Sequence, residues 1–540
     1  LSRGLGDVYK RQVWTGTADP ARSVSLRVWN TVESRWDELA SARGIADGDT
    51  TLQGRALAAH VDNDVVHVLV TGIDPFADDL SPRDESAADD KDHFENPDDY
   101  DFSFAHFTDT QYIAEGAAGG TYENFNGIEE PSDVQLVEEQ AVWQRAYRAE
   151  TEWIRDNADQ RKIEFTSHTG DVTENDTKDP LATDANGNLL YPGLDEQITR
   201  EFEFTSDAQG ILDEAGVVNQ VVAGNHDNQG GRETGAQSRF SRYFSPSRYY
   251  DAAQAWPDGA SYHAWDEETD ASGNVVTPGT DNQNNYVLFS AGGLDFVAVG
   301  LSYGVTPEEA DWASEIFARF PDRNGILSTH AYLAPSSAPD GRGANFSTDG
   351  SRLFDQVVEA NPNVFLVLAG HEHGVGTNLK RGIGATVSHN VVELLADYQF
   401  YKVTAGELFP DSVDASGNID LNGDGTVDHK STDLLQFGAS YLRLLQFDTE
   451  RSEMSIDTYS PHLDDFGATE YDDRHRYNGA EDNLTLPVDL STRRTSFTTD
   501  ALTVVTPTDT VIGTDTARSG WPATVEWAGL TEGEVYAWTS

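Results

Sequence analysis

The pattern of apolar and polar residues changes near residue 80 and again near residue 490, and these changes divide the chain into regions. Before the first change, short runs such as VSLRVW (residues 24–29) and VVHVLVT (residues 65–71) alternate between apolar and polar positions. A period of two, broken by polar turns, predicts a small β-rich module over residues 13–80. Residues 81–101 carry many acids and no periodicity, so we expect an exposed acidic linker there.

Between residues 102 and 490, apolar runs alternate with longer helical segments, which is typical of an α/β layered domain. The expected strands cover residues 102–108, 163–169, 217–223, 325–330 and 364–370, with a hairpin at 285–290 and 294–300. The expected helices cover about residues 134–157, 195–214, 307–320 and 352–360, and an antiparallel pair at 441–448 and 453–461 closes the sheet.

After about residue 491 the chain is rich in threonine, with short alternating runs such as ALTVV and ATVEW. We expect residues 491–540 to be the truncated start of a fibronectin-like β-sandwich, and we expect the module at 13–80 to be truncated as well. The first dozen residues, LSRGLGDVYKRQ, are basic in a very acidic protein, and we leave them out of the fold prediction.

Composition narrows the function classes. The 540 residues include 93 acidic and 36 basic ones, which gives a formal net charge of -57. Such a surface would repel phosphates over most of its area, so we expect no role as a nucleic acid scaffold. The chain contains no cysteine, so any metal must be held by oxygen and imidazole nitrogen. No apolar run reaches about 18 residues, so we expect no transmembrane segment.

Polar residues with metal-binding side chains directly follow five of the expected strands. Loops leave a layered sheet at the carboxyl ends of its strands, and side chains from distant parts of the sequence converge there. A Gly-Asp pair or a single histidine would alone be an ordinary turn or a hydrogen-bonded core residue. The ordered series instead predicts a site for divalent metals that accept imidazole and carboxylate ligands. Its members are Asp109 and Gln111; Asp171; Asn225, His226 and Asp227; His330; and His371 and His373.

The same stretches carry a family resemblance. In this order, FTDTQ, TGDVTEN, VVAGNHDN, LSTH and LAGHEHG resemble the successive motifs of the calcineurin-like metallophosphoesterase family. The resemblance covers about residues 101–461 and implies a four-layer α/β/β/α domain with two divalent metal ions at the strand ends. The fold class that we expect is therefore α/β, a metallophosphoesterase domain flanked in sequence by small β-rich modules. The resemblance also implies hydrolysis of a phosphate mono- or diester by metal-bound hydroxide.

The resemblance assigns roles to individual residues. It implies that His226 faces the phosphate and protonates or stabilises the leaving oxygen, while Asp227 orients the imidazole ring. The implied metal ligands are Asp109 and His373 for the first metal, Asp171 for both metals, and Asn225, His330 and His371 for the second.

Gln111 departs from the family pattern, because the first motif usually reads Asp-x-His and this chain reads Asp-Thr-Gln. A glutamine carbonyl oxygen is a harder and weaker ligand than imidazole. We therefore expect a first metal that is held less tightly, or a more oxygen-loving ion such as manganese or iron, with zinc as the alternative. Gln111 either completes the shell of that metal or hydrogen-bonds a ligand nearby.

A second candidate cation site lies in an expected Asp/Gly-rich insertion near residues 403–438. The stretch resembles the front of an EF-hand or dockerin-type calcium loop, with oxygens at positions 1, 3, 5 and 9 and a glycine at position 6. Position 12 falls on Ser431, which has no bidentate carboxylate, so a calcium site and a merely polar loop both stay open. The expected calcium ligands are Asp420, Asn422, Asp424 and Asp428.

Three functions agree with these observations. The first is a phosphoesterase with two divalent metal ions and a phosphate ester substrate. The second is a non-catalytic surface or polymer-binding protein with a degenerate phosphoesterase domain, which Gln111 favours, and which would contact cell wall or polysaccharide. The third is a nucleotidase or cyclic nucleotide phosphodiesterase, although no aromatic clamp for a base is visible in the sequence. The flanking β modules and the acidic surface predict a secreted or cell-surface location, with no signal peptide visible in the chain.

Overall fold

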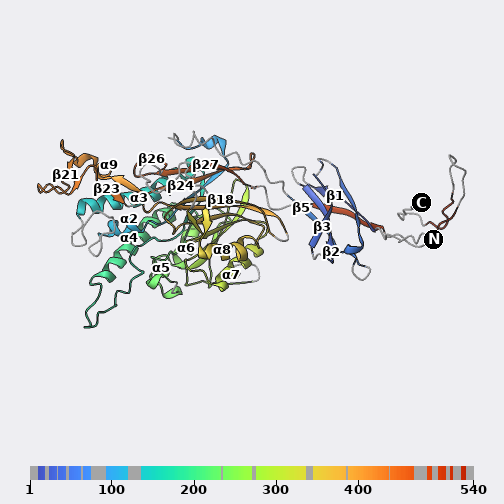
Figure 1. Ribbon diagram of the computed structural model, residues 1–540, viewed down its shortest axis with the longest axis horizontal. Helices are drawn as coiled ribbons and strands as arrows, with labels where there is room; N and C mark the ends of the chain where they lie inside the picture. The colour runs from blue at the N-terminus through green and yellow to red at the C-terminus, as the bar shows by residue number, and fades with distance from the viewer. Residues whose placement is uncertain are drawn as a thin grey trace. The chain divides into compact units, whose positions relative to one another are not determined.

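The chain divides into two compact units, which we call the small unit (Leu1–Pro75 with Arg494–Ser540) and the large unit (Phe76–Arg493) (Figure 1). Each is described by itself. The computed structural model describes residues 10–18, 23–32, 35–43, 45, 48–61, 65–73, 93–119, 136–232, 235–270, 275–335, 344–384, 387–436, 438–467, 483–488, 490, 497–505, 511–514 and 525–530.

The small unit contains two three-stranded β-sheets that share one apolar core. One sheet has the strand order β28-β1-β4 and the other has the order β3-β2-β5. Trp14, Val24, Leu26 and Leu52 form the centre of the core. The strands are β1 (Lys10–Ala18), β2 (Ser23–Asn30), β3 (Arg35–Arg43), β4 (Thr50–Ala56), β5 (Val68–Ile73) and β28 (Phe497–Val505).

Strand β28 corrects the domain prediction for the end of the chain. We expected residues 491–540 to begin a separate sandwich, but β28 pairs antiparallel with β1, from Arg11 opposite Val505 to Ala18 opposite Phe497. The strand therefore completes a sheet of the N-terminal module. An alternating run of residues predicts a half-buried strand but does not encode which distant strand it pairs with.

Two seven-stranded sheets form the centre of the large unit. In the first, β6, β7 and β8 are parallel, and in the second, β13, β14, β17 and β19 are parallel. The first sheet contains β26 (Asp465–Phe466), β25 (Glu453–Ser460), β24 (Leu442–Asp448), β6 (Phe102–Phe107), β7 (Ile163–His168) and β8 (Asn219–Val221) in this order, with β27 (Asn483–Pro487) paired to β25. The second contains β18 (Gly374–Ile383), β19 (His389–Asp397), β17 (Val364–Ala369), β14 (Asn324–Thr329), β13 (Leu294–Leu301), β12 (Asn284–Ala291) and β9 (Ser261–Ala264).

Burial on both faces of the sheets shows the layer order. On β6, Phe102 and Phe104 belong to the core that also contains Phe296 of β13, while Phe107 belongs to a cluster with helix residue Ile154. On β13 the neighbouring positions pack on the other side against the helix Pro307–Arg319. Both sheets thus lie between helices and face each other, which confirms the expected α/β/β/α fold class. Each buried phenylalanine contributes about 1.5–3 kcal/mol to this arrangement.

Helices α2, α3 and α4 pack together beside the first sheet (Figure 1). Helix α7 starts with a capping box between Thr306 and Glu309 and a proline in its first turn. Among the described residues, no helix is long and apolar enough to cross a membrane. The helices are α2 (Gln111–Ala118), α3 (Val137–Arg161), α4 (Leu194–Glu214), α5 (Arg239–Tyr243), α6 (Pro246–Ala252), α7 (Pro307–Arg319), α8 (Thr348–Leu353) and α9 (Ala405–Leu408).

The expected linker and the expected insertion both contact helix α3. Residues 81–92 of the linker lie outside the described residues, but Phe94 stacks on Trp153 of α3 at 5.1 Å between ring centroids. The last part of the expected exposed linker is therefore packed. In the insertion, His429 lies buried against Glu139 of α3, with 2.5 Å between Nε2 and Oε1. The insertion carries β20 (Lys402–Thr404), α9, β21 (Asn418–Ile419), β22 (His429–Lys430) and β23 (Leu434–Gln436).

Candidate metal centre

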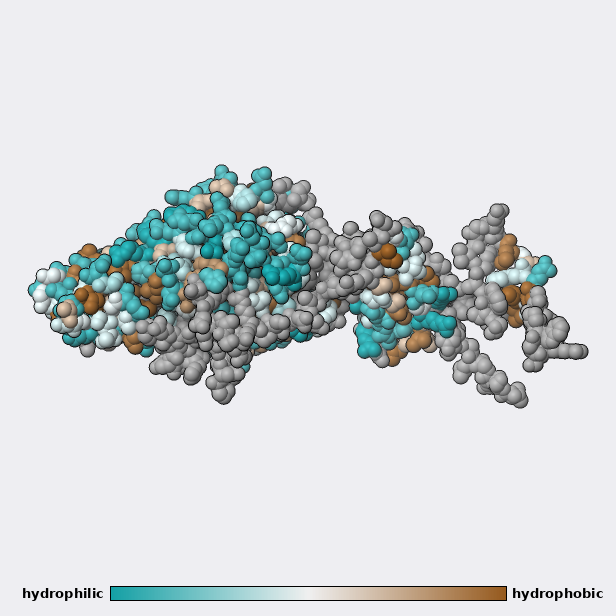
Figure 2. Space-filling model, turned by 90° about the horizontal axis from the view of Figure 1, so that it is seen from above, coloured by the Kyte–Doolittle hydropathy of each residue, from teal (hydrophilic) through white to brown (hydrophobic). Residues whose placement is uncertain are grey.

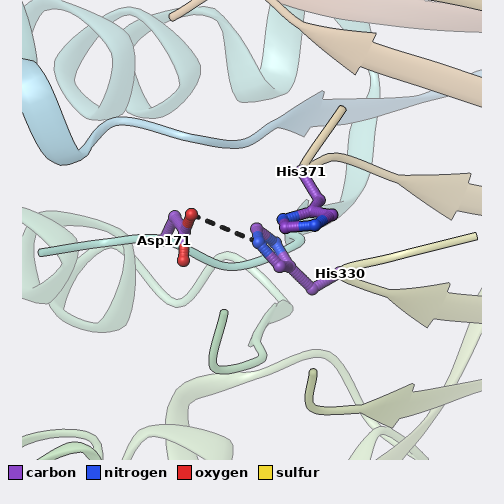
Figure 3. Close-up of side chains that lie close together, drawn as sticks. All are labelled: Asp171, His330 and His371. Carbon is purple, nitrogen blue, oxygen red and sulfur yellow. Dashed lines mark ion pairs between the residues drawn. The ribbon is translucent and has the colours of Figure 1, made fainter. Parts of the chain in front are cut away.

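Three of the predicted ligands meet in the interior of the large unit. Asp171 follows β7 of the first sheet, whereas His330 and His371 follow β14 and β17 of the second (Figure 3). Their ligand atoms all lie within 4.8 Å of one another. The carboxyl ends of strands from both sheets therefore bring together side chains that are 200 positions apart in sequence.

The surroundings of His330 favour a positive charge, which either a proton on the ring or a metal ion supplies. Its Nδ1 donates to the carbonyl oxygen of Thr169 at 2.8 Å, so Nε2 is the nitrogen that faces the site. Nε2 lies 3.2 Å from Asp171 Oδ2 and 3.1 Å from Asn225 Oδ1, and neither oxygen can donate a hydrogen bond. Burial lowers the pKa of His330, but the charges of Asp171 and Asp109 outweigh it and raise the pKa to about 9. One nitrogen and two oxygens converging in this way fit a divalent metal.

The loops that carry these residues have an unusual backbone. Asp109, Asp171 and His371 have φ angles of 54°, 55° and 73°, in the left-handed region that non-glycine residues rarely adopt. A Cβ atom on Gly224 would lie 2.0 Å from Asp171 Oδ1, and one on Gly370 would lie 2.2 Å from Asp109 Oδ2. These two positions therefore require glycine, and three of the candidate ligands lie on strained backbone.

Asp109, which follows β6, forms hydrogen bonds with the loops after β7 and β17. Its backbone N–H donates to Gly170 O at 3.0 Å, and its carboxylate accepts from the backbone N–H of His371 at 3.0 Å. Burial raises the pKa of Asp109, and nearby Asp171 adds to the shift while His330 opposes it. His373 lies beside Phe400, with 3.7 Å between ring centroids. Within the described part of the chain, Asp109 and His373 are outside the three-residue group above, and a first metal held by them stays a prediction.

Gln111 is the first residue of α2 and is almost fully buried. Its Nε2 donates to Asp171 Oδ2 at 3.2 Å and to Gln399 Oε1 at 2.6 Å. Its Oε1 is buried and has no hydrogen-bond partner. An unpaired buried carbonyl oxygen costs about 1–3 kcal/mol unless a ligand meets it, and a hard divalent cation is such a ligand.

Sequence reasoning missed two residues next to Gln111. Asp397 ends β19, and Gln399 follows two positions later; both are buried. The signal was available, because the segment ADYQ follows an apolar strand just as the predicted ligands do. Burial and the charge of Asp109 raise the pKa of Asp397 well above its usual value, while two hydrogen bonds from Gln399 oppose that shift.

The ring of His226 is held by Glu174 and not by Asp227, which corrects the predicted role of Asp227. His226 Nδ1 donates to the carbonyl oxygen of Glu174 at 2.8 Å and lies 3.1 Å from its carboxylate. Burial lowers the pKa of His226, but the charges of Asp171 and Glu174 outweigh it and raise the pKa to about 11. The backbone N–H of His226 also donates to Asp171 Oδ1 at 2.8 Å, which places the residue at the candidate centre.

Asp227 ties two loops together instead. Its carboxylate accepts from the backbone N–H groups of Gly224 at 2.8 Å, Thr173 at 2.8 Å and Val172 at 3.1 Å. These buried N–H groups would otherwise have no partner. Because the carboxylate accepts from all three, it does not hydrogen-bond the neighbouring imidazole ring. Asp227 thereby fixes the loop of Asp171 to the loop of His226.

The predicted calcium ligands lie on an exposed turn between β21 and β22. The Asp420 carboxylate accepts from the backbone N–H groups of Gly423 at 2.8 Å and Gly425 at 2.9 Å, and Asn422 Oδ1 accepts from that of Asp424 at 2.9 Å. Asp428 Oδ2 accepts from the N–H of Leu421 at 2.7 Å. These oxygens satisfy the backbone of their own loop, and calcium binding there stays a prediction.

A cavity of about 620 Å³ borders the loops after Asp171 and after His226. Its wall combines charged, polar and apolar groups. Arg239 forms ion pairs with Asp176 and Asp195, while Arg242 donates to the carbonyl oxygen of Gln237 at 2.7 Å. The lining also includes Leu181, Leu189, Tyr191 and Gln229.

Comparisons with known proteins agree with this geometry. A family model described as calcineurin-like phosphoesterase matches residues 102–375. The chain is 25% identical over 535 residues to the uncharacterized protein YvnB of Bacillus subtilis (strain 168), a match that covers 97% of this chain and 31% of that protein. The chain thus spans less than a third of the length of this curated relative.

Two solved structures share a distant similarity with the chain. One is a dimetal phosphatase from Danio rerio, at 10% identity and a TM-score of 0.33, covering 72% of this chain and 99% of that chain. The other is GAP50 of Plasmodium, at 10% identity and a TM-score of 0.30, covering 73% and 90%.

Proposed function

Because the chain belongs to the calcineurin-like phosphoesterase family, we propose that it hydrolyses a phosphate mono- or diester with two divalent metal ions at its strand ends. The observation that carries this proposal is the meeting of His330 Nε2 with Asp171 Oδ2 and Asn225 Oδ1, at 3.2 and 3.1 Å. Without metal, a proton on His330 balances these two oxygens, and a divalent metal ion in place of that proton would take all three atoms as ligands.

The residues divide between the two metals as the resemblance implies. We assign Asp171 to both metals, because one of its oxygens faces His330 and Gln111 while the other accepts from the backbone of His226. Two bound divalent cations supply an activated water and neutralise the phosphoryl oxygens. The second metal would be held by Asn225, His330 and His371, and the first by Asp109, Gln111 and His373.

His226 is our candidate for the general acid. Its Nδ1 is fixed on Glu174, so Nε2 is the nitrogen left for a substrate, and the side chain stays 28% exposed. Burial lowers the pKa of His226, but Asp171 and Glu174 raise it, and Glu174, which is not a candidate metal ligand, favours a proton on the ring. A protonated imidazole can donate to the leaving oxygen, which is the charge that develops when the phosphate ester bond breaks.

The metal identity and the substrate are finer proposals. The carbonyl of Gln111 favours manganese or iron over zinc at the first metal. We place the leaving part of the substrate in the 620 Å³ cavity, because that cavity borders both the Asp171 and the His226 loops. Its polar and apolar lining suits an organic group that carries its own hydrogen-bonding atoms.

We also propose a secreted or cell-surface location. The formal net charge of -57 and the largely hydrophilic visible face of the large unit support this proposal (Figure 2). A contact of the small unit with polysaccharide stays a prediction. Fractionation of cells that produce the native protein, followed by immunodetection, tests the location, and a purely cytoplasmic signal would contradict it.

The catalytic proposal is tested by hydrolysis of a chromogenic phosphomonoester and a matching diester, with manganese, iron or zinc added. We expect His226→Ala to lower kcat by about 10²–10⁴-fold, the usual contribution of a general acid, with unchanged metal content by elemental analysis. Equal background rates for both proteins would favour the non-catalytic surface or polymer-binding protein. Adding nucleotides and cyclic nucleotides to the panel distinguishes a nucleotidase or cyclic nucleotide phosphodiesterase, which would show selectivity for the base.

A further inference from the structure

Two buried amide side chains lie in series beside the candidate metal centre. Gln111 donates from Nε2 to Gln399 Oε1 at 2.6 Å, and Gln399 donates from its own Nε2 to Asp397 Oδ2 at 3.1 Å. The exposed fractions of Gln111, Gln399 and Asp397 are 1%, 4% and 0%, so water does not compete for these bonds. The three residues come from α2, from the loop after β19 and from β19 itself.

The direction of these hydrogen bonds is fixed at both ends, by Asp397 at one end and by Asp171 Oδ2, which accepts from Gln111 Nε2 at 3.2 Å, at the other. The backbone N–H of Gln399 donates to Asp397 Oδ1 at 2.9 Å, and this donor cannot change places with an acceptor. The ionised carboxylate only accepts, and Gln399 accordingly turns its NH₂ group toward Asp397 and its carbonyl toward Gln111. Gln111 must in turn give its NH₂ group to Gln399. The carbonyl oxygen of Gln111 is then the end of the series, and it is the buried atom that has no partner.

We propose that Asp397 and Gln399 are positioning residues that hold the carbonyl of Gln111 toward the first metal, an inference that rests on the dinuclear site proposed above. An amide presents either a ligand oxygen or a repelling N–H group to a cation, depending on which way it is turned. A histidine ligand has its orientation fixed by a hydrogen bond at its other nitrogen. The amide of Gln111 also needs a fixed orientation. Asp397 provides it through the amide of Gln399.

A purely structural network would be built differently. Buried polar groups that only stabilise a fold satisfy their hydrogen-bonding atoms within the network, because a half-satisfied network costs more than an apolar core. Here Gln399 and the NH₂ group of Gln111 are engaged, and the one unpaired atom is the Gln111 carbonyl oxygen, on a side chain that also contacts Asp171. The unpaired atom therefore marks where the network meets its ligand.

The test reverses the donors and acceptors of these hydrogen bonds with a substitution that keeps the shape of the side chain. Asp397→Asn places an NH₂ group against Gln399, which can then turn its amide over and set its own NH₂ group against that of Gln111, in opposition to the orientation that Asp171 Oδ2 favours. We expect Mn²⁺ binding at the weaker of two sites to fall by about 10–100-fold, the usual cost of losing a residue that orients a metal ligand. Adding Gln399→Glu to Asp397→Asn restores an acceptor for Gln111 and the original net charge, and we expect it to recover most of the lost affinity.

The readout is isothermal titration calorimetry of the full chain with MnCl₂ in the absence of substrate, with circular dichroism and Tm as folding controls. A second background, Gln111→His, supplies an imidazole ligand that does not need an amide partner. We expect Asp397→Asn to lose little Mn²⁺ affinity in that background. If the wild type binds two Mn²⁺ ions and Asp397→Asn binds both equally well, or if the double substitution gives no recovery, the positioning role is wrong while the phosphoesterase proposal stands. If the wild type binds no Mn²⁺, iron or zinc, the proposed function fails and the positioning role fails with it.

Discussion

The strand-end cluster around Asp171 and the exposed turn from Asp420 to Asp428 both carry the side chains expected of a cation site, and they are built in opposite ways. In the cluster, the candidate ligands come from several strands of two sheets and are largely buried. In the turn, the candidate ligands come from nine consecutive positions and are half-buried or exposed. In the cluster, Asp171 Oδ2 and Asn225 Oδ1 both lie against His330 Nε2, whereas the oxygens of the turn accept from backbone N–H groups of the turn itself.

The two regions differ in whether their acceptor oxygens are satisfied before an ion binds. An acid-rich turn satisfies itself through local hydrogen bonds and is stable whether or not an ion arrives. A buried group of converging acceptors is unstable alone, so its persistence implies something that neutralises it. Buried acceptors that converge from several strands, such as Asp171 Oδ2 and Asn225 Oδ1 at His330 Nε2, are therefore the stronger sign of a metal.

The largest expected effect comes from removing the charge at the middle of the cluster. Asp171→Asn keeps the shape of the side chain but removes the carboxylate shared by His330, Gln111 and the backbone of His226. We expect loss of bound manganese, iron or zinc by elemental analysis and a fall in phosphoesterase activity of more than about a hundredfold, beyond the cost of losing an orienting partner. Asp424→Asn on the exposed turn is the matched control and should change neither quantity. Equal effects of the two substitutions would remove the distinction between the regions.

An intermediate effect is expected on stability, at the residue that ties the cluster loops together. Asp227→Ala leaves the buried N–H groups of Gly224, Thr173 and Val172 without an acceptor. We expect a loss of about 3 kcal/mol in the free energy of unfolding of the large unit, measured by urea denaturation. Asp424→Ala, which removes an exposed carboxylate, should cost less than about 0.5 kcal/mol. A comparable loss for both would mean that the exposed turn supports the fold as strongly as the cluster does.

The smallest effect is a local response of the turn to acid. Hydrogen bonds from Thr426, through its side chain and its backbone N–H, lower the pKa of Asp424. A carboxylate whose pKa is lower in the folded state adds stability above its unfolded pKa of about 3.9, and that stability is lost as the pH falls through the folded value. We expect hydrogen exchange at Thr426 to lose protection below about pH 4 while amides near Asp227 stay protected. Protection at Thr426 that does not change down to pH 2 would contradict this reading of the turn.

The fold could be predicted from the sequence because its central strands are continuous apolar runs. The strands expected at 102–108, 163–169 and 364–370 lie within one residue of β6, β7 and β17. Helix α2 was not predicted, because it has only eight residues, includes a glycine and begins directly at Gln111. The place of β28 was not predicted either, because pairing across most of the chain leaves no local signal.

The candidate site could be predicted as a set of residues but not as a set of contacts. Asp171, His330 and His371 were identified because each directly follows a strand, and strand ends converge. The family resemblance implied that Asp227 orients the ring of His226. The side chain of Glu174, 52 positions away, lies against the ring instead. Asp397 and Gln399 were overlooked because their role depends on the direction of hydrogen bonds, which residue types alone do not specify.

The pairing of β1 with β28 sets an order of events during synthesis. Strand β1 cannot pair with β28 until Val505, the partner of Arg11, has been synthesised. At a translation rate of about 5–20 residues per second, this delay lasts roughly half a minute to two minutes. The whole phosphoesterase sequence leaves the ribosome during that interval. The large unit therefore has time to fold while the first sheet still has an open edge, which is a place where nascent chains can associate wrongly.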